Sequence, residues 1–464
     1  MVLLWAMPTL QRMVNNYPST HVKSMTKLKI TKRISNALIS SVGAGVVPRI
    51  GLEYIAVGRE KEVKAVLQDL DNIGEGSAAF RFIVGRYGSG KSFMLQLIRN
   101  YAMEKGFVVA DADLSPERRL TGTDGKGVAT YRELMQNFST KIRPEGGALT
   151  PILEGWINGI QNQVAQDNDM RPNDSGFDDL VETRIREVVK DVEGLVHGFD
   201  FANVIIAYWR GYRLDDDDKK EAALRWLRGE FGTKTEAKSA LGVRVIIDDE
   251  TWYDYLKLFA KFISDIGYKG LLILLDEAVH LYKITHTASR QKNYDKLLAM
   301  FNDTMQGRAE NLGIYLGGTP EFVEDKRRGL YSDEALRSRL SSRVKNGHKD
   351  ISAPVIQLET LTSQNISELL HRLVDVHAAH YNYNKTLKPS ELQEFMQEVV
   401  NRLGAEKFLT PREVVRDFIS ILNIMQQNPD ISFNELIRGD NFKPTLPSKN
   451  SDVDGDNEFA EFTL

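Results

Sequence analysis

The clearest chemical signal in the chain is one segment of eight residues that matches the pattern G-x-x-x-x-G-K-[ST] at every fixed position: Gly85, Arg86, Tyr87, Gly88, Ser89, Gly90, Lys91 and Ser92. Its glycines allow successive backbone N–H groups to turn inward around a phosphate. Lys91 can neutralise the β- and γ-phosphate oxygens, and the Ser92 hydroxyl can ligate Mg²⁺ at a helix N-terminus. The sequence therefore predicts a phosphate-binding loop formed by all eight residues. The alternative is a Gly-rich turn that binds nothing.

A second signal is the apolar run Leu271–Leu275, which is followed directly by Asp276 and Glu277. A continuous apolar run is typical of a buried parallel strand, and the carboxyl end of such a strand points at the ligand crevice. We therefore expect Asp276 to lie beside Ser92 and hold Mg²⁺, and Glu277 to polarise a water for attack on the γ-phosphate. This pair favours nucleotide hydrolysis over phosphoryl transfer to a small molecule, because a water must be activated. The alternative is that the two acids merely begin a loop.

Thr319 is a weaker candidate, at the end of a further apolar run in the segment Leu316-Gly317-Gly318-Thr319-Pro320. Its hydroxyl could donate a hydrogen bond to the γ-phosphate or to the attacking water. It could equally be an ordinary turn threonine, since Ser and Thr are common beside Pro in turns.

The elements that must position these residues follow from the apolar runs. Five runs have the length of strands: Phe80–Val84, Phe107–Ala110, Leu271–Leu275, Gly313–Leu316 and Pro354–Leu358. The first precedes the phosphate-binding loop, and the amphipathic stretch Phe93–Met103 follows the loop. Strand, loop and helix in this order are the context that the motif requires. The sequence thus predicts an α/β fold with a parallel five-stranded sheet.

Between the second and third strand candidates the pattern is mostly helical, and it is helical again after Leu358. We divide the chain into a basic N-terminal arm (1–42), the first part of the core (43–130), a helical insertion (131–258), the second part of the core (259–360), a C-terminal helical domain (361–438) and an acidic tail (439–464). Thr362 and Thr410 are expected to begin helices, with Pro411 at the first helical position after Thr410.

Composition narrows the classes of protein. No window holds 18 consecutive apolar residues, which excludes a transmembrane helix, and the absence of cysteine excludes disulfides and thiol nucleophiles. Both features favour a cytoplasmic protein without a membrane partner. The net charge of −4 gives no general attraction to DNA, but residues 1–52 carry seven bases and no acid, so DNA binding through this arm is conceivable.

These motifs together resemble the AAA+ superfamily of ATPases, in particular its origin-recognition branch. Several phrases, among them IGLEYIAVGR, FRFIVGRYGSGKSF, ALRWLRGE and LLILLDEAVHLY, are similar to the ATP-binding family of bacterial phage-exclusion (BREX) systems. The resemblance covers about residues 43–426. It implies a five-stranded core followed by a helical lid domain over 361–438, and ATP as the nucleotide.

The resemblance also assigns two arginines. Arg343, in Ser341-Ser342-Arg343, resembles a finger that reaches the γ-phosphate of a neighbouring subunit, and Arg339 is its nearest rival. Arg412, in Thr410-Pro411-Arg412-Glu413, resembles the second sensor of the lid, which touches phosphate within its own chain. The chain departs from the superfamily by its insertion, since Lys91 and Asp276 are 185 positions apart.

The expected function is that of an ATP-binding and ATP-hydrolysing AAA+ protein of prokaryotic anti-phage defence. Its cofactors would be ATP and Mg²⁺, and nucleotide-dependent assembly of a homo-oligomer would be coupled to action on another defence protein or on DNA. The alternative is a nucleotide switch that hydrolyses ATP slowly or not at all and serves as the scaffold of a defence or signalling complex.

Overall fold

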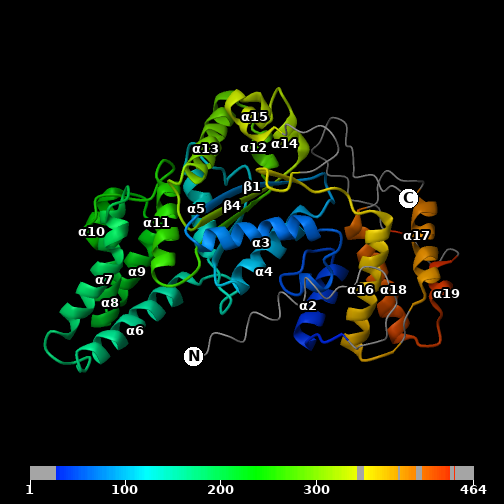
Figure 1. Cartoon of the computed structure of the whole chain (residues 1–464), viewed down its shortest axis with the longest axis horizontal. Coiled ribbons are helices and arrows are strands. Elements are labelled where there is room, and N and C mark those ends of the chain that lie inside the picture. Colours follow the sequence, from blue (N-terminus) through cyan, green and yellow to red (C-terminus); the bar gives the residue numbers. More distant parts are fainter. Residues whose placement is uncertain (1–27, 342–349, 385–386, 404–409, 439–443, 445–464) are drawn as a thin grey trace.

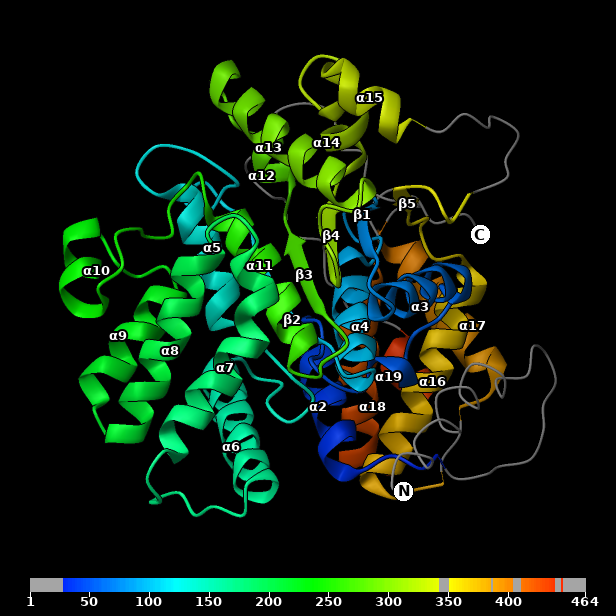
Figure 2. The ribbon, with the colours of Figure 1, turned by 60° about the vertical axis from the view of Figure 1, so that its left-hand side comes forward.

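The computed structural model describes residues 28–341, 350–384, 387–403, 410–438 and 444. Within these residues, five strands form one sheet in the order β2-β3-β4-β1-β5 (Figure 2). All neighbouring strands are parallel. The strands are β1 (Ala78–Val84), β2 (Val108–Asp113), β3 (Leu271–Asp276), β4 (Leu312–Gly318) and β5 (Val355–Gln357). The predicted α/β fold with a parallel five-stranded sheet is confirmed.

The run Leu271–Leu275 of β3 is continuously apolar because both faces of the sheet are covered there. In β3, Leu271 and Ile273 pack into a core with the insertion helices, while Leu272 and Leu274 pack into a second core. That second core is formed with α3 (Glu60–Gly74) and α4 (Lys91–Glu104). Side chains that alternate between two apolar layers leave no polar position in the strand.

The predicted helical insertion lies at one side of the sheet (Figure 1). It is built from α5 (Lys126–Gln136), α6 (Leu149–Asp167), α7 (Phe177–Glu193), α8 (Gly198–Leu214), α9 (Asp217–Leu227), α10 (Lys234–Leu241) and α11 (Trp252–Asp265). Phe259 of α11 packs edge-on against Phe138 and Phe201, and all three rings belong to the same core as one face of the sheet. The insertion therefore shares its hydrophobic core with the sheet.

Two helices, α12 (Val279–Tyr282) and α13 (Thr287–Met305), follow β3, and two more, α14 (Pro320–Glu324) and α15 (Glu334–Leu340), follow β4. Among the described residues the longest helices are α6, α13 and α16 (Ser363–Tyr381), with 19 residues each. No helix in the described part of the chain combines the length and apolarity that crossing a membrane would need.

The C-terminal helices form a cluster with its own core (Figure 1). They are α16 (Ser363–Tyr381), α17 (Pro389–Leu403), α18 (Pro411–Gln427) and α19 (Phe433–Ile437). Thr362 and Asn365 form a reciprocal capping box at α16, and Pro411 occupies the first turn of α18 next to Thr410.

Part of the predicted N-terminal arm belongs to this cluster. Residues 32–43 form α2 (Lys32–Gly43), whose buried Leu38, Ile39 and Val42 pack against α16 and α18. The two bases of this helix, Lys32 and Arg33, are exposed in its first turn. In this part of the segment 1–42, an apolar stripe on the helix is buried against helices from the other end of the chain.

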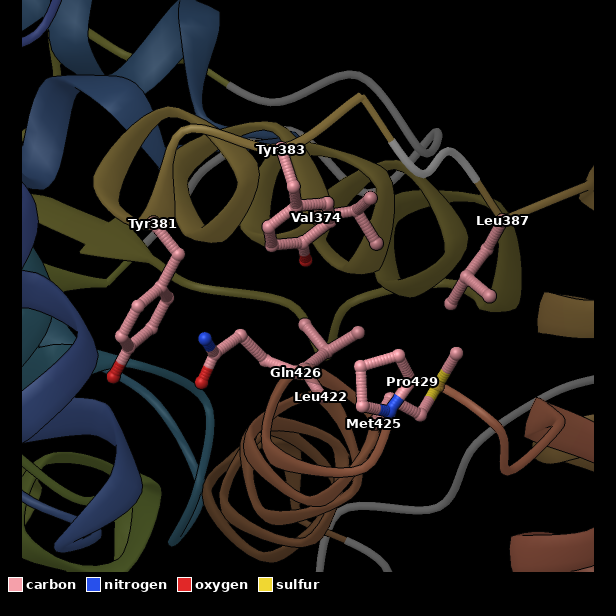
Figure 3. A pocket seen from close by; sticks show the side chains of 8 residues that line it. All are labelled: Val374, Tyr381, Tyr383, Leu387, Leu422, Met425, Gln426 and Pro429. Carbon is pink, nitrogen blue, oxygen red and sulfur yellow. The ribbon is translucent and has the colours of Figure 1, made fainter.

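An apolar pocket opens between α16 and α18 (Figure 3). It is lined by Val374, Tyr381, Tyr383, Leu387, Leu422, Met425, Gln426 and Pro429. The Tyr383 hydroxyl is bound to Nδ1 of His377 at 2.8 Å, so its polar end is already partnered. None of the lining residues is a predicted nucleotide ligand.

Candidate nucleotide-binding site

The phosphate-binding loop connects buried β1 to α4, as the motif predicts. Gly88 and Gly90 have φ values of +80° and +90°, in the left-handed region that strains residues with a side chain. Gly85 is needed for a different reason: a β carbon there would lie 2.2 Å from Ser89 Oγ. The loop therefore closes tightly at the N-terminus of α4, where backbone N–H groups and the helix dipole favour an anion.

Lys91 reaches back across the loop. Its Nζ donates to the carbonyl oxygens of Gly85 at 2.9 Å and Arg86 at 3.1 Å. Burial lowers the pKa of Lys91, while the charges of Asp276, Glu277 and Glu321 oppose that shift. The ammonium is thus held inside the loop, and a bound phosphate would add the negative charge that favours its protonated form.

Ser92 and Asp276 are in direct contact although 184 residues separate them. Ser92 Oγ donates to Asp276 Oδ2 at 2.6 Å, and Asp276 Oδ1 accepts from the backbone N–H of Glu277 at 2.8 Å. A hydroxyl and a carboxylate fit Mg²⁺, which prefers hard oxygen ligands and is commonly held by one or two protein groups plus phosphate and water. The described residues contain no group of three or more His, Asp or Glu that could hold a metal alone. Nucleotide oxygens and water would complete the coordination.

Gly317 makes this contact possible, and sequence reasoning missed it. Strand β4 lies between β3 and β1, so the Asp276 side chain must cross the end of β4 to reach Ser92. A β carbon at Gly317 would lie 2.3 Å from Asp276 Oδ1 and 3.0 Å from Leu95 Cδ1. The sequence signal for this role is the pair Gly317 and Gly318 at the end of an apolar run.

Glu277 has a strained backbone, with φ +57° in a residue other than glycine. Burial raises the pKa of its carboxyl, although part of the side chain reaches solvent. The negative charges of Asp276 and Asp113 also raise that pKa, whereas Lys91 and Lys283 lower it. A carboxylate with a raised pKa is a stronger proton acceptor, as a general base requires.

Asp113 is a further acidic residue at this edge that was not assigned to the site. It ends β2 and pairs in register with Asp276 on β3. Burial and the charges of Asp276 and Asp111 raise the pKa of Asp113. The carboxylates repel one another, and a divalent cation would relieve that repulsion.

The contacts of Thr319 are those of a helix cap. Its Oγ1 accepts from the backbone N–H of Phe322 at 3.4 Å, and Pro320 occupies the first turn of α14. This is the geometry of the turn-threonine alternative. A hydrogen bond from Thr319 to phosphate or to the attacking water stays a prediction.

Arg412 lies at the phosphate-binding loop, in line with the resemblance. Its Nη1 donates to the Tyr87 hydroxyl at 3.3 Å, and its guanidinium carbon lies 6.0 Å from the centre of the Tyr87 ring. Gly88 packs against the same helix start, because a β carbon there would lie 2.8 Å from Thr410 Cβ. The first turn of α18 therefore contacts the loop directly.

The predicted finger Arg343 lies outside the described residues. Its rival Arg339, on α15, is exposed. Its Nε donates to Asn302 Oδ1 at 3.0 Å, and its Nη1 donates to the carbonyl of Ala335 at 2.9 Å. These partners lie on α13 and on its own helix, and neither belongs to the phosphate-binding loop.

The match to known families extends over nearly the whole described chain. Residues 30–441 match the family described as "BREX system ATP-binding protein BrxC/D", a range that includes α2, the sheet, the insertion and the C-terminal helices. No curated protein matches the chain. The loop, the Ser92–Asp276 contact and this extended match agree, and the chain belongs to the BrxC/D family of BREX system ATP-binding proteins.

Proposed function

We propose that the chain binds Mg·ATP in the loop Gly85–Ser92 and hydrolyses it as an AAA+ ATPase of prokaryotic anti-phage defence. The observation that carries this proposal is the 2.6 Å contact between Ser92 Oγ and Asp276 Oδ2. It brings a phosphate-binding loop and an acidic strand end into one site, as hydrolysis with a metal ion requires.

Each residue has a role that its position supports. The backbone N–H groups of the loop and Lys91 would bind the phosphates, and Ser92 and Asp276 would hold Mg²⁺. The ion, when bound, neutralises charge on the phosphate oxygens. Glu277 would accept a proton from the attacking water, and Arg412 would contact phosphate from the start of α18.

The assignment to the AAA+ superfamily is supported by the sheet order β2-β3-β4-β1-β5 and by the helical cluster that contacts the loop through Arg412. In this proposal α16–α19 form a lid, Arg343 acts on a neighbouring subunit, and ATP drives assembly of a homo-oligomer. The family name makes other BREX proteins the expected partners, and DNA is the second candidate for what the assembly acts on.

One observation favours a second function, the slow or non-hydrolysing switch. Thr319 Oγ1 accepts from the backbone N–H of Phe322 as the cap of α14, and this bond favours a structural role over one on the attacking water. With Glu277 as the single residue acting on the water, hydrolysis would be slow and ATP would remain intact in the site for longer.

Steady-state ATP turnover and ATP affinity test both functions together. We expect Lys91→Ala to abolish tight Mg·ATP binding while the chain stays folded, because it removes the phosphate-neutralising charge. Turnover in the parent chain, with or without added DNA, indicates the ATPase; tight binding without turnover indicates the switch. Unchanged ATP affinity of Lys91→Ala by calorimetry would contradict the proposed site.

A further inference from the structure

Arg59 is a buried arginine that joins three elements of the fold. It precedes α3 at the N-cap position, without a side-chain bond to that helix, and is only 8 % exposed. Its Nη2 donates to the carbonyl of Ser89 in the phosphate-binding loop at 2.8 Å and to the carbonyl of Glu359 at 2.5 Å. Glu359 lies on the connection from β5 to α16. One side chain therefore ties the loop to the chain segment that leads into the C-terminal helices.

The bond to Ser89 fixes the direction of the next N–H group. No peptide bond of the described residues is cis, and in a trans peptide the C=O and the following N–H point in opposite directions. Because the Ser89 carbonyl is held toward Arg59, the N–H of Gly90 is held toward the other side of the loop. Gly90 is the residue before α4, where a loop N–H is available to a phosphate.

The segment that carries Arg59 is packed against α16. A β carbon at Gly58 would lie 2.8 Å from the Asn365 side chain, and Arg372 donates to the carbonyl of Ala56 at 2.5 Å. Both Asn365 and Arg372 belong to α16. A shift of α16 would therefore move Arg59, and with it the Ser89 carbonyl.

We infer that Arg59 is a positioning residue of the phosphate site: it orients the Gly90 N–H toward bound phosphate and couples the occupancy of the site to the connection at Glu359. This inference rests on the proposed binding of ATP. By reciprocity, if the state of the connection alters affinity for phosphate, bound phosphate alters the connection by the same free energy.

Calorimetry with ATP and with pyrophosphate tests the first half of the inference, because pyrophosphate can bind the loop alone. We expect Arg59→Ala to bind both ligands at least about tenfold more weakly, the scale of losing one charge-assisted hydrogen bond. Arg59→Lys should lose less, because it keeps the charge but has a shorter side chain. Equal losses for ATP and pyrophosphate would locate the effect at the phosphates.

Arg81→Lys is the matched control. Arg81 is equally buried and also bonds backbone carbonyls, those of Ser352 and Ala353 before β5, together with Asp69 on α3. None of these partners belongs to the phosphate-binding loop. We therefore expect Arg81→Lys to lower thermal stability as much as Arg59→Lys while retaining the ligand affinities of the parent.

Hydrogen exchange over residues 359–365 tests the coupling. We expect ATP to slow exchange there in the parent and in Arg81→Lys, but not in Arg59→Lys.

The outcomes separate this inference from the proposed function. If the parent binds ATP and both Arg59 variants bind ATP and pyrophosphate as tightly as the parent does, the role of Arg59 is overturned and the proposed function stands. If the parent binds neither ligand, the proposed function fails and the inference falls with it. If Arg59→Ala does not fold, Arg59→Lys decides by the same criteria.

Discussion

Gly317 has no side chain, and this leaves room for the Asp276 carboxylate beside it. The first prediction concerns this residue. In Gly317→Ala the new β carbon would meet Asp276 Oδ1 at 2.3 Å, so we expect Asp276 to move away from Ser92. Mg-dependent affinity for ATP, measured by calorimetry with and without Mg²⁺, should fall about tenfold or more, which corresponds to ~1.4 kcal/mol.

The neighbouring Gly318→Ala is the control for this prediction. Its β carbon would meet the Phe322 ring at 2.7 Å instead of Asp276. We expect Gly318→Ala to lower stability while the gain in affinity from Mg²⁺ is kept. If Gly317→Ala retains the parent's Mg-dependent affinity, the crossing of β4 by Asp276 is not needed for binding.

Glu277 gives the second prediction. Glu277→Gln removes the proton acceptor but keeps the size of the side chain, so ATP should still bind while turnover falls by about 10²-fold or more. Glu321→Gln is the control, since Glu321 also acts on the charge of Lys91 but lies on α14. Turnover of Glu277→Gln at the parent rate would show that Glu277 is not the base.

At the scale of elements, the strands and the loop could be predicted because their signals are local. A continuous apolar run identifies β3 as a buried strand from its own residues alone. The motif at Gly85–Ser92 is likewise recognised from the residues of the loop and from the strand and helix patterns beside it. The contributions of Asp113, Gly317 and Arg59 could not be predicted in this way. They depend on which strands and connections are neighbours, and that order is decided by packing between segments far apart in the chain.

Helix α2 shows the same limit. Its apolar residues Leu38, Ile39 and Val42 have helical spacing, so a helix could have been expected locally. Their partners on α16 and α18 lie more than 300 residues away in the sequence, so no local pattern indicates this packing.

The C-terminal cluster yields a third prediction, on pH. His377 of α16 is fully buried, and burial lowers its pKa below the usual 6.5; a hydrogen bond to Asn423 opposes this, and the charge of His380 adds to it. A buried imidazole that resists protonation stabilises the fold above about pH 6.5, and that stability is lost as the pH falls toward the lowered pKa, since the unfolded chain then binds the proton.

Thermal unfolding at a series of pH values checks this prediction. We expect the unfolding midpoint to fall between pH 7.5 and 5.5, and the slope to be smaller in His377→Gln. Burial also lowers the pKa of His371 on the same helix, so part of the slope should persist. An equal slope in the variant would exclude His377 as a source.

At the scale of the whole molecule, the proposed active site would be completed between subunits. Lys91→Ala and Arg343→Ala should each be inactive alone, because one lacks the phosphate-binding charge and the other lacks the finger. In a mixture, some interfaces join an intact loop to an intact Arg343, so part of the ATPase activity should return. A mixture that co-assembles, as shown by pull-down of differently tagged chains, and yet stays inactive would contradict action between subunits.

The order of the strands also has a consequence for synthesis of the chain. β1 and β2 emerge first from the ribosome, but they are not neighbours: β1 pairs with β4 and β5, and β2 pairs with β3. At roughly 5–20 residues per second, β1 is finished on the order of 10–50 s before the end of β4 is made. During that interval the apolar residues of Ala78–Val84 have no strand beside them, and the nascent chain offers the kind of edge that aggregates or recruits chaperones. Because β4 must be made before β1 is enclosed in the sheet, the loop Gly85–Ser92 that follows β1 would take its final form late in synthesis.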